Sequence, residues 1–317
     1  MDDPVPGRHL LVASTGGHLA QLARWAEMLG SSPDSLWITF KSPQSDSVLH
    51  NRRAMYVPYI APRDAGSSAR AFMRMMREID WRNEAFDAAI TTGSAVGLAG
   101  LVAARLHRVP AYFFESASRV NGPSLSGRLA SLYPRIHTFS QYHYADSRWQ
   151  FRTSLFDSFE TVSGPSNPKP RLFVTLGTIH PYRFDALVDA ILATGLADDR
   201  TVWQLGSTGR RSLPGRAEAQ MPATEFDECA RNADIVITHS GVGTIMHLLE
   251  MGIYPVVVPR RVKRREMVDD HQTQIATLLT ARGISAVCEV ENLDKNIIIE
   301  ATGKTIRYTR EAPKGVD

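Results

Sequence analysis

The stretch from Asp234 to Gln272 reads DIVITHSGVGTIMHLLEMGIYPVVVPRRVKRREMVDDHQ. It predicts a strand over Asp234–Thr238, a glycine turn, a helix, a second strand over Tyr254–Val258 and then a charged loop. A strand that ends in a glycine-rich turn and leads into a helix presents free backbone N–H groups to an anion. A polar cluster after the next parallel strand falls on the same edge of the sheet. A place for a diphosphate beside a place for a hydroxyl-rich group indicates a nucleotide-sugar site.

The same alternation of strand and helix runs along the rest of the chain. The apolar runs are continuous, which is typical of strands buried on both faces. Strands that alternate with helices over short turns predict parallel sheets, and hence an α/β fold. The expected strands are His9–Ala13, Leu36–Phe40, Ala88–Thr92, Ala111–Phe114, Ile136–Ser140, Leu172–Leu176, Thr201–Leu205, Asp234–Thr238 and Tyr254–Val258.

A cluster of chain breakers, Ser163–Pro170, lies near the middle of the sequence and predicts a linker. It separates an N-terminal domain, residues 1–163, from a C-terminal domain, residues 171–317. Each half opens with a strand and a glycine turn, at Gly16-Gly17 in the first half and at Gly177-Thr178 in the second. We therefore expect two Rossmann-like domains that face each other across a cleft. The tail after Ala301 is compatible with either a last helix or a frayed end.

The composition indicates an ordinary globular protein and argues against a nucleic-acid-binding, a secreted or a membrane-spanning protein. The 317 residues are 43% hydrophobic and carry a formal net charge of only +3, which is too small to indicate nucleic-acid binding. The two cysteines, Cys229 and Cys288, are far apart and lack metal-ligand spacing, as in proteins of a reducing compartment. The N-terminus lacks the apolar core of a signal peptide, and no apolar run is long enough to span a membrane. We expect a cytoplasmic protein.

The first glycine turn places His18 directly after Gly16 and Gly17, at the start of an expected helix. Two glycines let a ligand approach the backbone, and the positive helix end favours an anion and lowers the pKa of an imidazole. A neutral histidine there could accept a proton from an attacking hydroxyl. The alternative is a helix-capping histidine with no part in chemistry.

A second candidate group follows the strand Ala111–Phe114. Glu115 stands where parallel α/β sheets bind ligands, at the carboxyl end of a strand, and Ser116 and Arg119 follow it within four residues. Glu115 could act as a base, with Ser116 and Arg119 near the acceptor. It could equally pair with Arg119 or cap the next helix.

In the opening stretch, Ser240, Gly241, Gly243 and Thr244 form the candidate phosphate cradle. The run Asp269-Asp270-His271-Gln272 follows the next strand, and its carboxylate and amide groups could bind neighbouring sugar hydroxyls. One of the two aspartates could instead cap the helix that begins there.

Two basic segments each have two interpretations. Arg260 and Arg261 open a charged loop beside the candidate cradle, where they either pair with a diphosphate or form an ordinary solvated charge run. The segment Ser67–Arg82 places its arginines on one side of a helical wheel, opposite apolar residues. Such a helix either lies on anionic lipid or buries its apolar face in the core. The arginines are Arg70, Arg74, Arg77 and Arg82.

Several sequence motifs resemble those of known glycosyltransferases, and they occur in the expected order along the chain. Thr238–Gln272 is similar to the donor-binding subunit of the two-subunit UDP-GlcNAc transferase that makes dolichol-linked chitobiose, and more broadly to the C-terminal half of glycosyltransferase family 28. The first half resembles the membrane-associated partner subunit, and bacterial capsule and exopolysaccharide clusters carry related pairs as separate genes. The motifs of the first half are Ser14–His18, Thr91–Gly93, Phe114–Arg119 and Ser124–Leu129.

The resemblance implies a GT-B fold, a UDP-sugar donor, inverting transfer without a bound metal or other cofactor, and a polyprenyl-linked acceptor at the cytoplasmic face of a membrane. It implies that Gly241, Gly243 and Thr244 lie at the UDP phosphates and that Asp270 and Gln272 lie near the donor sugar. His18 and Glu115 fall in acceptor-side motifs, where a base is needed.

The chain departs from this family at one position. Many relatives carry a ribose-binding glutamate six residues after the position of Gly241, whereas this chain has His247 there and Glu250 three residues later. The primary hypothesis is a UDP-dependent hexosyltransferase of cell-surface polysaccharide biosynthesis. The alternatives are a UDP-sugar 2-epimerase of the same fold and a non-catalytic protein that binds nucleotide sugars.

Overall fold

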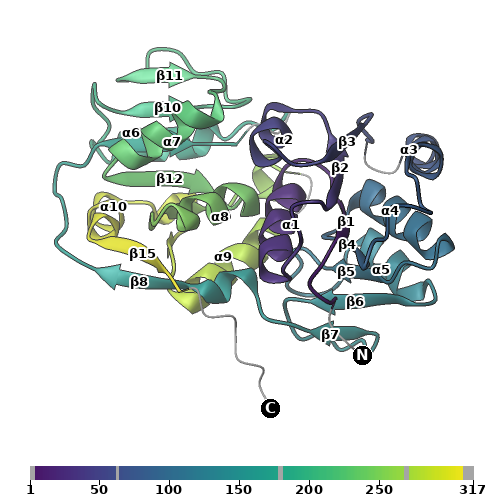
Figure 1. The fold of residues 1–317 in the computed structure, drawn as a ribbon. Helices are drawn as coiled ribbons and strands as arrows, with labels where there is room; N and C mark the ends of the chain where they lie inside the picture. Colours follow the sequence, from purple (N-terminus) through teal and green to yellow (C-terminus); the bar gives the residue numbers. More distant parts are fainter. Residues whose placement is uncertain (1–3, 62–63, 178–180, 268–270, 310–317) are drawn as a thin grey trace. The chain divides into compact units, whose positions relative to one another are not determined.

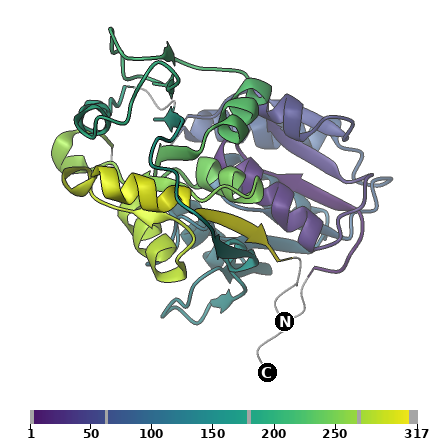
Figure 2. The same cartoon turned by 90° about the vertical axis from the view of Figure 1, so that its left-hand side faces the viewer.

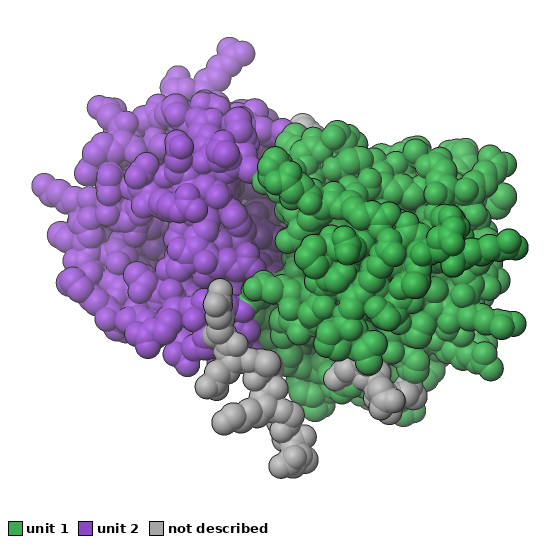
Figure 3. Space-filling view, in the orientation of Figure 1, with its two compact units in different colours: residues 1–155 green, residues 156–317 purple. Residues whose placement is uncertain are grey.

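The computed structural model describes residues 4–61, 64–177, 181–267 and 271–309, with the side chain of residue 271 left out. The chain divides into two compact units, Met1–Leu155 and Phe156–Asp317, which are coloured separately in Figure 3. The breaker cluster Ser163–Pro170 belongs to the second unit. Within the described residues no helix is both long and apolar enough to cross a membrane.

The first unit is built on a seven-stranded parallel sheet. Its strand order is β3-β2-β1-β4-β5-β6-β7, in which the chain starts at the centre, runs to one edge and then crosses to the other half. β1, with Leu10, Leu11 and Val12 all fully buried, lies at this crossover. The strands are β1 (His9–Val12), β2 (Leu36–Phe40), β3 (Ala54–Val57), β4 (Ala88–Thr91), β5 (Ala111–Phe114), β6 (Ile136–Ser140) and β7 (Trp149–Phe151).

Helices cover both faces of this sheet. α1 (Gly17–Met28) and α2 (Pro43–Val48) lie on one face, and α3 (Ala65–Glu78), α4 (Ser94–Leu106) and α5 (Leu125–Leu132) form a layer on the other (Figure 1). The neighbouring strands β1 and β4 are therefore followed by helices on opposite faces, α1 and α4. The turns between these strands and their helices lie at the carboxyl edge of the sheet.

The second unit repeats the plan with a six-stranded parallel sheet of order β11-β10-β9-β12-β13-β14. β9 and β12 lie at its centre, so the glycine turns that follow them are neighbours at the carboxyl edge. The strands are β9 (Leu172–Thr175), β10 (Val202–Gln204), β11 (Arg216–Glu218), β12 (Ile235–His239), β13 (Val256–Val258) and β14 (Ala286–Val287). The helices are α6 (Asp185–Ala193), α7 (Ala223–Asn232), α8 (Val242–Glu250), α9 (His271–Arg282) and α10 (Lys295–Thr302).

All nine expected strands are present, with ends that differ by no more than two residues. The sequence analysis missed β3, β7, β11 and β14, which are short strands near or at the sheet edges, where the apolar run is weak. It also missed an antiparallel pair, β8 (Phe159–Ser163) with β15 (Lys304–Tyr308). Of the tail after Ala301, Lys304–Tyr308 therefore form a strand, and β15 packs with α10 (Figure 2).

The N-cap residue distinguishes two groups among the helices. Ser42, Asp64, Ser124 and Asp294 cap α2, α3, α5 and α10 with their side chains, which satisfies backbone N–H groups of the first turn. In contrast, α1, α4 and α8 follow the glycine N-caps Gly16, Gly93 and Gly241, with no side-chain cap. Their first N–H groups remain available to a ligand.

Candidate active site

A glutamine from α2 fixes the backbone of the turn between β1 and α1. Gly16 has a φ of 86°, a conformation that favours glycine. Its N–H donates to Gln44 Oε1 at 2.5 Å, and Gln44 Nε2 donates to the Gly16 carbonyl at 3.0 Å. These two bonds fix the backbone that leads into Gly17 and His18, so the start of α1 is preorganised.

The imidazole of His18 is anchored by one nitrogen. His18 Nδ1 lies 2.8 Å from the Thr92 carbonyl, and Thr92 Oγ1 donates to the His18 carbonyl at 2.7 Å. Because a carbonyl oxygen only accepts, Nδ1 must carry the proton of a neutral ring. Nε2 is then the basic nitrogen of the ring.

The neighbouring turn after β4 makes room for this ring. Gly93 has a φ of 119°, and a Cβ built on it would lie 2.9 Å from His18 Cε1. A side chain at position 93 would therefore push the imidazole away from the Thr92 carbonyl. The sequence motif Thr91-Thr92-Gly93 is explained by this contact.

The surroundings of His18 favour the neutral imidazole. Burial lowers the pKa of His18, the positive charge of Arg119 lowers it further, and the Thr92 carbonyl opposes both effects. The sequence argument ascribed a lowered pKa to the positive end of the helix. The direction agrees with that prediction, but burial is the largest cause in the structure.

Glu115 is fully buried directly after β5, and its carboxylate accepts hydrogen bonds at both oxygens. Oε1 accepts from the Ser116 N–H at 3.0 Å, and Oε2 accepts from the Ser124 N–H at 2.8 Å and from Ser124 Oγ at 3.0 Å. Burial raises the pKa of Glu115 against these bonds and against the charge of Arg119. The carboxylate thus joins the end of β5 to the N-cap of α5.

Two buried glutamines, which the sequence analysis did not single out, connect Glu115 with α1. Gln21 of α1 accepts from the Ala117 N–H at 2.7 Å and donates to Ser116 Oγ at 3.1 Å. Gln141, after β6, donates to the Glu115 carbonyl at 3.1 Å. A glutamine three residues after His18 on a helix gives no sequence signal, because only the fold brings residues 21, 115 and 141 together.

Ser116 and Arg119 lie in the loop that this network holds. Ser116 is almost completely buried, whereas Arg119 is partly exposed. The Arg119 N–H donates to the Ser116 carbonyl at 2.9 Å, and the Tyr144 hydroxyl donates to the Arg119 carbonyl. The first unit therefore gathers His18, Ser116 and Arg119 around one preorganised edge of the sheet, with Glu115 buried beneath the loop.

In the second unit, β12 ends on a buried histidine, His239, directly before the glycine turn. The His239 ring lies between two glycines: a Cβ at Gly177 would be 2.5 Å from its Cε1, and a Cβ at Gly241 would overlap its Nε2. Burial lowers the pKa of His239 to about 3, and the charge of Arg260 contributes to this. The sequence analysis began its cradle one residue later, at Ser240, and so missed His239.

The start of α8 has the features of an anion site. Its N-cap, Gly241, provides no side-chain cap, and Gly243 and Thr244 lie partly exposed in its first turn. Ser240 is 2% exposed, and its hydroxyl has no hydrogen-bond partner among the described residues. Since a buried hydroxyl is normally satisfied, Ser240 and the first N–H groups of α8 remain able to bind a ligand.

Arg260, after β13, is completely buried behind this edge. Its guanidinium donates to the carbonyls of Tyr182 at 3.0 Å and Glu266 at 3.2 Å, and also to the carbonyl of Leu176. Burial lowers the pKa of Arg260 to about 10, against the charge of Glu266. The guanidinium thereby joins three loops at the carboxyl edge of the sheet. It would stabilise an anion there by long-range electrostatic attraction, without a direct contact.

Of the predicted sugar-binding group, Gln272 is described. It is buried, and its Oε1 accepts from the Arg260 N–H at 3.1 Å, so it helps to hold the loop after β13. Asp270 and Thr178 lie outside the described residues.

His247 lies on the exposed side of α8. Its Nε2 is 2.6 Å from Asp227 Oδ1 of α7. A carboxylate therefore stands beside the position where the resembling family carries a glutamate, although another helix provides it.

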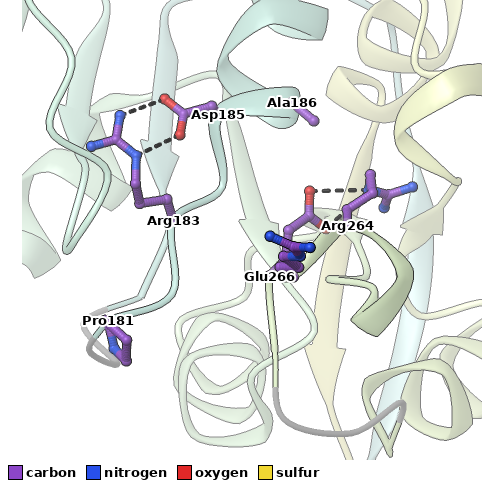
Figure 4. A pocket seen from close by; sticks show the side chains of 7 residues that line it. Pro181, Arg183, Asp185, Ala186, Arg264 and Glu266 are labelled. Carbon is purple, nitrogen blue, oxygen red and sulfur yellow. Dashed lines mark hydrogen bonds and ion pairs between the residues drawn. The ribbon is translucent and has the colours of Figure 1, made fainter.

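The basic loop after β13 is largely neutralised within the second unit. Arg261 pairs with Glu289, and Arg264 pairs with Glu266 and Glu291. A groove of about 370 Å³ lies beside it (Figure 4). Its charged walls carry the Arg183–Asp185 and Arg264–Glu266 pairs, so much of the groove's charge is already compensated. The groove is lined by Pro181, Arg183, Asp185, Ala186, Arg264, Arg265 and Glu266.

The described side chains contain no cluster of three or more histidine, cysteine, aspartate or glutamate residues that could hold a metal ion.

Comparison with known proteins agrees with this two-unit plan. Residues 210–312 match the model of the glycosyltransferase family 28 C-terminal domain, which lies within the second unit. A relative from Cryptococcus neoformans var. neoformans, named UDP-N-acetylglucosamine transferase subunit ALG13, is 32% identical over 73 residues. Those residues are 23% of this chain and 36% of the relative, so the match spans about a third of that protein.

Solved structures match nearly the whole chain. MurG from Acinetobacter baumannii has a TM-score of 0.53 at 18% identity, over 92% of this chain and 88% of that one. The glycosyltransferase SnogD from Streptomyces nogalater has a TM-score of 0.53 at 18% identity, over 94% and 92% of the two chains. At this identity the likeness establishes the fold, which is the GT-B type with two Rossmann-like domains. The expected fold class is thereby confirmed.

Proposed function

We propose that this chain, whose second unit carries a glycosyltransferase family 28 C-terminal domain, is an inverting hexosyltransferase that moves a sugar from a UDP-sugar to a saccharide acceptor. The observation that carries the proposal is the state of His18, a neutral imidazole whose Nδ1 is fixed on the Thr92 carbonyl and whose Nε2 is basic. The family match in residues 210–312 supports a nucleotide-sugar donor, and the Cryptococcus relative, a UDP-N-acetylglucosamine transferase subunit, supports UDP.

In the proposed reaction, His18 Nε2 takes the proton of the acceptor hydroxyl. The acceptor oxygen forms a bond to the anomeric carbon of the donor, and the bond between that carbon and the β-phosphate oxygen breaks. The electron pair leaves with UDP, and attack from the face opposite the leaving group inverts the anomeric configuration. The proton on the imidazolium is then released to solvent.

The turn before α8 suits the departing diphosphate. Gly241, Gly243 and Thr244 would offer backbone N–H groups, and the helix would offer its positive end where the negative charge of UDP grows. Ser240 would add a hydroxyl that has no hydrogen-bond partner among the described residues. The buried Arg260 adds positive charge behind the turn. Gly177 on the neighbouring turn, Gln272 and His247 complete the proposed donor site, together with Thr178 and Asp270, which lie outside the described residues.

Within this proposal Glu115 is a positioning residue and His18 is the base. Both Glu115 oxygens are occupied by Ser116 and Ser124, so the carboxylate orders the loop that would hold the acceptor. Gly16, Gly17, Ser116 and Arg119 form the proposed acceptor side.

We propose that the reaction needs no metal ion, because backbone dipoles and Arg260 could supply the charge that stabilises UDP. Transfer measured with and without EDTA tests this. Unchanged turnover is expected, and loss of turnover that Mg²⁺ or Mn²⁺ restores would overturn it.

The acceptor in this proposal is a polyprenyl-linked saccharide of cell-surface polysaccharide synthesis, such as capsule or exopolysaccharide, bound by an enzyme peripheral to the inner face of the membrane. The resemblance of the acceptor-side motifs supports this, as do the arginines of α3.

The decisive experiment compares wild type with His18→Ala on UDP-sugars, with and without a saccharide acceptor. Loss of transfer with unchanged UDP affinity is expected. An epimerised UDP-sugar formed without an acceptor would favour a 2-epimerase, and binding without any turnover would favour a non-catalytic protein. A thermal-shift screen of UDP-sugars would identify the donor, since a ligand specific for the folded state raises Tm by mass action.

A further inference from the structure

Exposed aromatic rings are rare in this protein, and they lie at one edge of one sheet. Among the described tryptophan, tyrosine and phenylalanine side chains, two are exposed, Tyr59 at 69% and Phe151 at 39%. Tyr59 follows β3 by two residues and Phe151 is the last residue of β7, so both lie at the carboxyl edge of the first unit's sheet. The exposed aromatic surface is therefore placed on the edge that parallel α/β sheets use for ligands.

Phe151 forms a stacked pair with His143. The two ring centroids are 4.0 Å apart, and the ring planes are inclined by 23°. His143 lies in the loop after β6 and is exposed like Phe151. Because both rings stay exposed although they cover each other on one side, each keeps surface for a further flat partner. We call Phe151 and His143 the aromatic platform.

The loop that carries His143 is bonded to the loop after β5 by the residues on either side of the histidine. The Tyr142 hydroxyl donates to the Ala117 carbonyl at 2.7 Å, and the Tyr144 hydroxyl donates to the Arg119 carbonyl. Both neighbours of His143 thus point inward, which leaves its imidazole at the outer surface. The aromatic platform is therefore held in a fixed position relative to the proposed acceptor side.

The sheet sets the distance between the aromatic platform and the loop after β5. One strand, β6, separates β7 from β5 (Figure 1). Since adjacent strands lie about 4.8 Å apart, the platform is roughly 10 Å from the end of β5. A saccharide whose reacting sugar is held at the loop after β5 would place a following sugar over the platform.

The chemistry of the aromatic platform fits a pyranose ring. One face of a pyranose carries only C–H groups, which pack on an aromatic face, and its hydroxyls point sideways toward polar groups. Neither ring nitrogen of His143 has a hydrogen-bond partner among the described residues, so both remain able to bind a hydroxyl. Arg152, directly after Phe151, is partly exposed and provides a cation beside the platform.

The size of the aromatic platform argues against a protein or a lipid surface as its occupant. Such partners contact contiguous apolar patches of several hundred Å². The platform consists of two rings, and the chain between them carries the ion pair Asp146–Arg148. A small apolar area bordered by charged groups is suited to one or two sugar rings.

We propose that the aromatic platform is a binding subsite for a sugar of the acceptor other than the one that is glycosylated. This inference rests on the proposed function, since it extends the acceptor side of the same site. Phe151 and His143 touch no reacting atom in this role. They determine specificity, because an acceptor long enough to reach the platform gains a contact that a single sugar lacks.

The first test measures saccharide binding without a donor, by calorimetry and saturation-transfer NMR. The probes are oligosaccharides of glucose, galactose, mannose and N-acetylglucosamine with one to five residues, because stacking depends on the C–H face rather than on one pattern of hydroxyls. Wild type should bind the longer probes more tightly than the monosaccharides. Phe151→Leu keeps an apolar side chain but removes the aromatic face, and should raise the dissociation constant of the longer probes about three- to tenfold.

Three further variants separate stacking from stability. Phe151→Tyr keeps the ring and should bind like wild type. His143→Ala removes the second ring and should weaken binding in the same direction as Phe151→Leu. Leu106→Ala is the matched control, since Leu106 is an exposed apolar residue at the last position of α4, whose first residue lies at the carboxyl edge. It should bind like wild type.

The second test measures transfer from UDP-sugars to acceptors of the same lengths. Phe151→Leu should raise KM for the longer acceptors and leave kcat, and the KM of short acceptors, unchanged. A purely structural role of Phe151 would instead change the kinetics with all acceptors.

Three results would overturn the inference: no probe that binds to wild type, equal affinities for monosaccharides and longer probes, or a Phe151→Leu variant that binds the longer probes as tightly as wild type. Transfer that occurs with a KM independent of acceptor length would likewise reject the subsite and leave the proposed function intact. Length-dependent binding that Phe151→Leu weakens, without transfer from any UDP-sugar, would reject the proposed function and leave the saccharide site standing.

Discussion

The turns after β1 and β12 both join a central strand to a helix with a glycine N-cap, and they differ in the position of the histidine relative to the glycine. In the first unit, glycines precede the histidine, so His18 lies inside α1 with one nitrogen on the Thr92 carbonyl. In the second unit, the histidine precedes the glycine, so His239 ends the strand and is enclosed by Gly177 and Gly241. Burial lowers the pKa of both rings.

Under the proposed function, the order of histidine and glycine separates two chemical roles. A ring placed after the turn is held by Nδ1 and would use Nε2 as the base. A ring enclosed by the turn supports the backbone that would face the donor, and its neutrality avoids adding a second buried cation beside Arg260.

The largest expected effect removes the base on the first turn. His18→Ala should lower kcat by roughly 100- to 10,000-fold, the usual contribution of a general base. UDP affinity, measured by calorimetry, should be unchanged because the second unit is intact. A variant that loses kcat and UDP affinity together would contradict the separation of roles.

The next effect tests how tightly the second turn encloses His239. Gly177→Ala adds a Cβ that would lie 2.5 Å from the His239 ring, at a φ of 73°. Gly195→Ala is the matched control, with a φ of 69° and no atom within 4 Å of its Cβ. We expect Gly177→Ala to lower the free energy of unfolding by about 1–3 kcal/mol more than the control, because it adds a clash to the backbone strain. Equal losses in denaturant melts would show that the ring can move aside.

The enclosed histidine also predicts acid sensitivity. The pKa of His239 is about 3 in the fold against 6.5 for the free group, so the unfolded chain takes up its proton first as pH falls. The contribution of His239 is therefore complete above pH 6.5 and is lost between pH 6.5 and 3, at about 1.4 kcal/mol per pH unit. Unfolding of wild type and His239→Gln across this range measures it. Parallel curves for the two proteins would exclude His239 as the source.

A smaller effect is expected at the positioning residue of the first unit. Glu115→Gln replaces one accepting oxygen by an amide group that cannot accept from Ser116 or Ser124, so we expect a loss of about 1–3 kcal/mol in unfolding free energy. Its kcat should fall less than that of His18→Ala. Ser124→Ala removes the hydroxyl bond to Glu115 together with the N-cap bond from the Gly127 N–H, and should cost about 1–2 kcal/mol. A kcat as low as that of His18→Ala, in a stably folded Glu115→Gln, would make Glu115 the base.

The smallest effect is expected at His247, which is tied to Asp227 on the exposed side of α8. His247→Ala should weaken UDP binding by less than about tenfold, or 1.4 kcal/mol. Asp227→Asn should act in the same direction if the pair works together. Unchanged UDP affinity in both variants would remove His247 from the donor site.

The pattern of apolar runs and glycine turns predicted the two Rossmann-like domains because buried parallel strands leave a continuous apolar signature. It also placed His18, Glu115 and the α8 turn at carboxyl ends of strands, where the structure has them. It did not reveal Gln21 and Gln141, since residues 21, 115 and 141 meet only after the strands are ordered in the sheet. His239 was missed because Gly241, two residues later, carries the stronger local signal.

The sequence by itself therefore determined the alternation of strands and helices and the glycine turns that follow the central strands, which depend on residues close in the chain. Only the tertiary structure decided which nitrogen of His18 is basic, which carboxylate is buried and fully bonded, and which aromatic rings remain outside the core. Those properties depend on a carbonyl 74 residues away, on burial and on the hydrogen bonds between loops at the carboxyl edge of the sheet. The proton affinity and the exposure of a side chain depend on residues that are distant in the sequence, so neither property can be predicted from the local sequence.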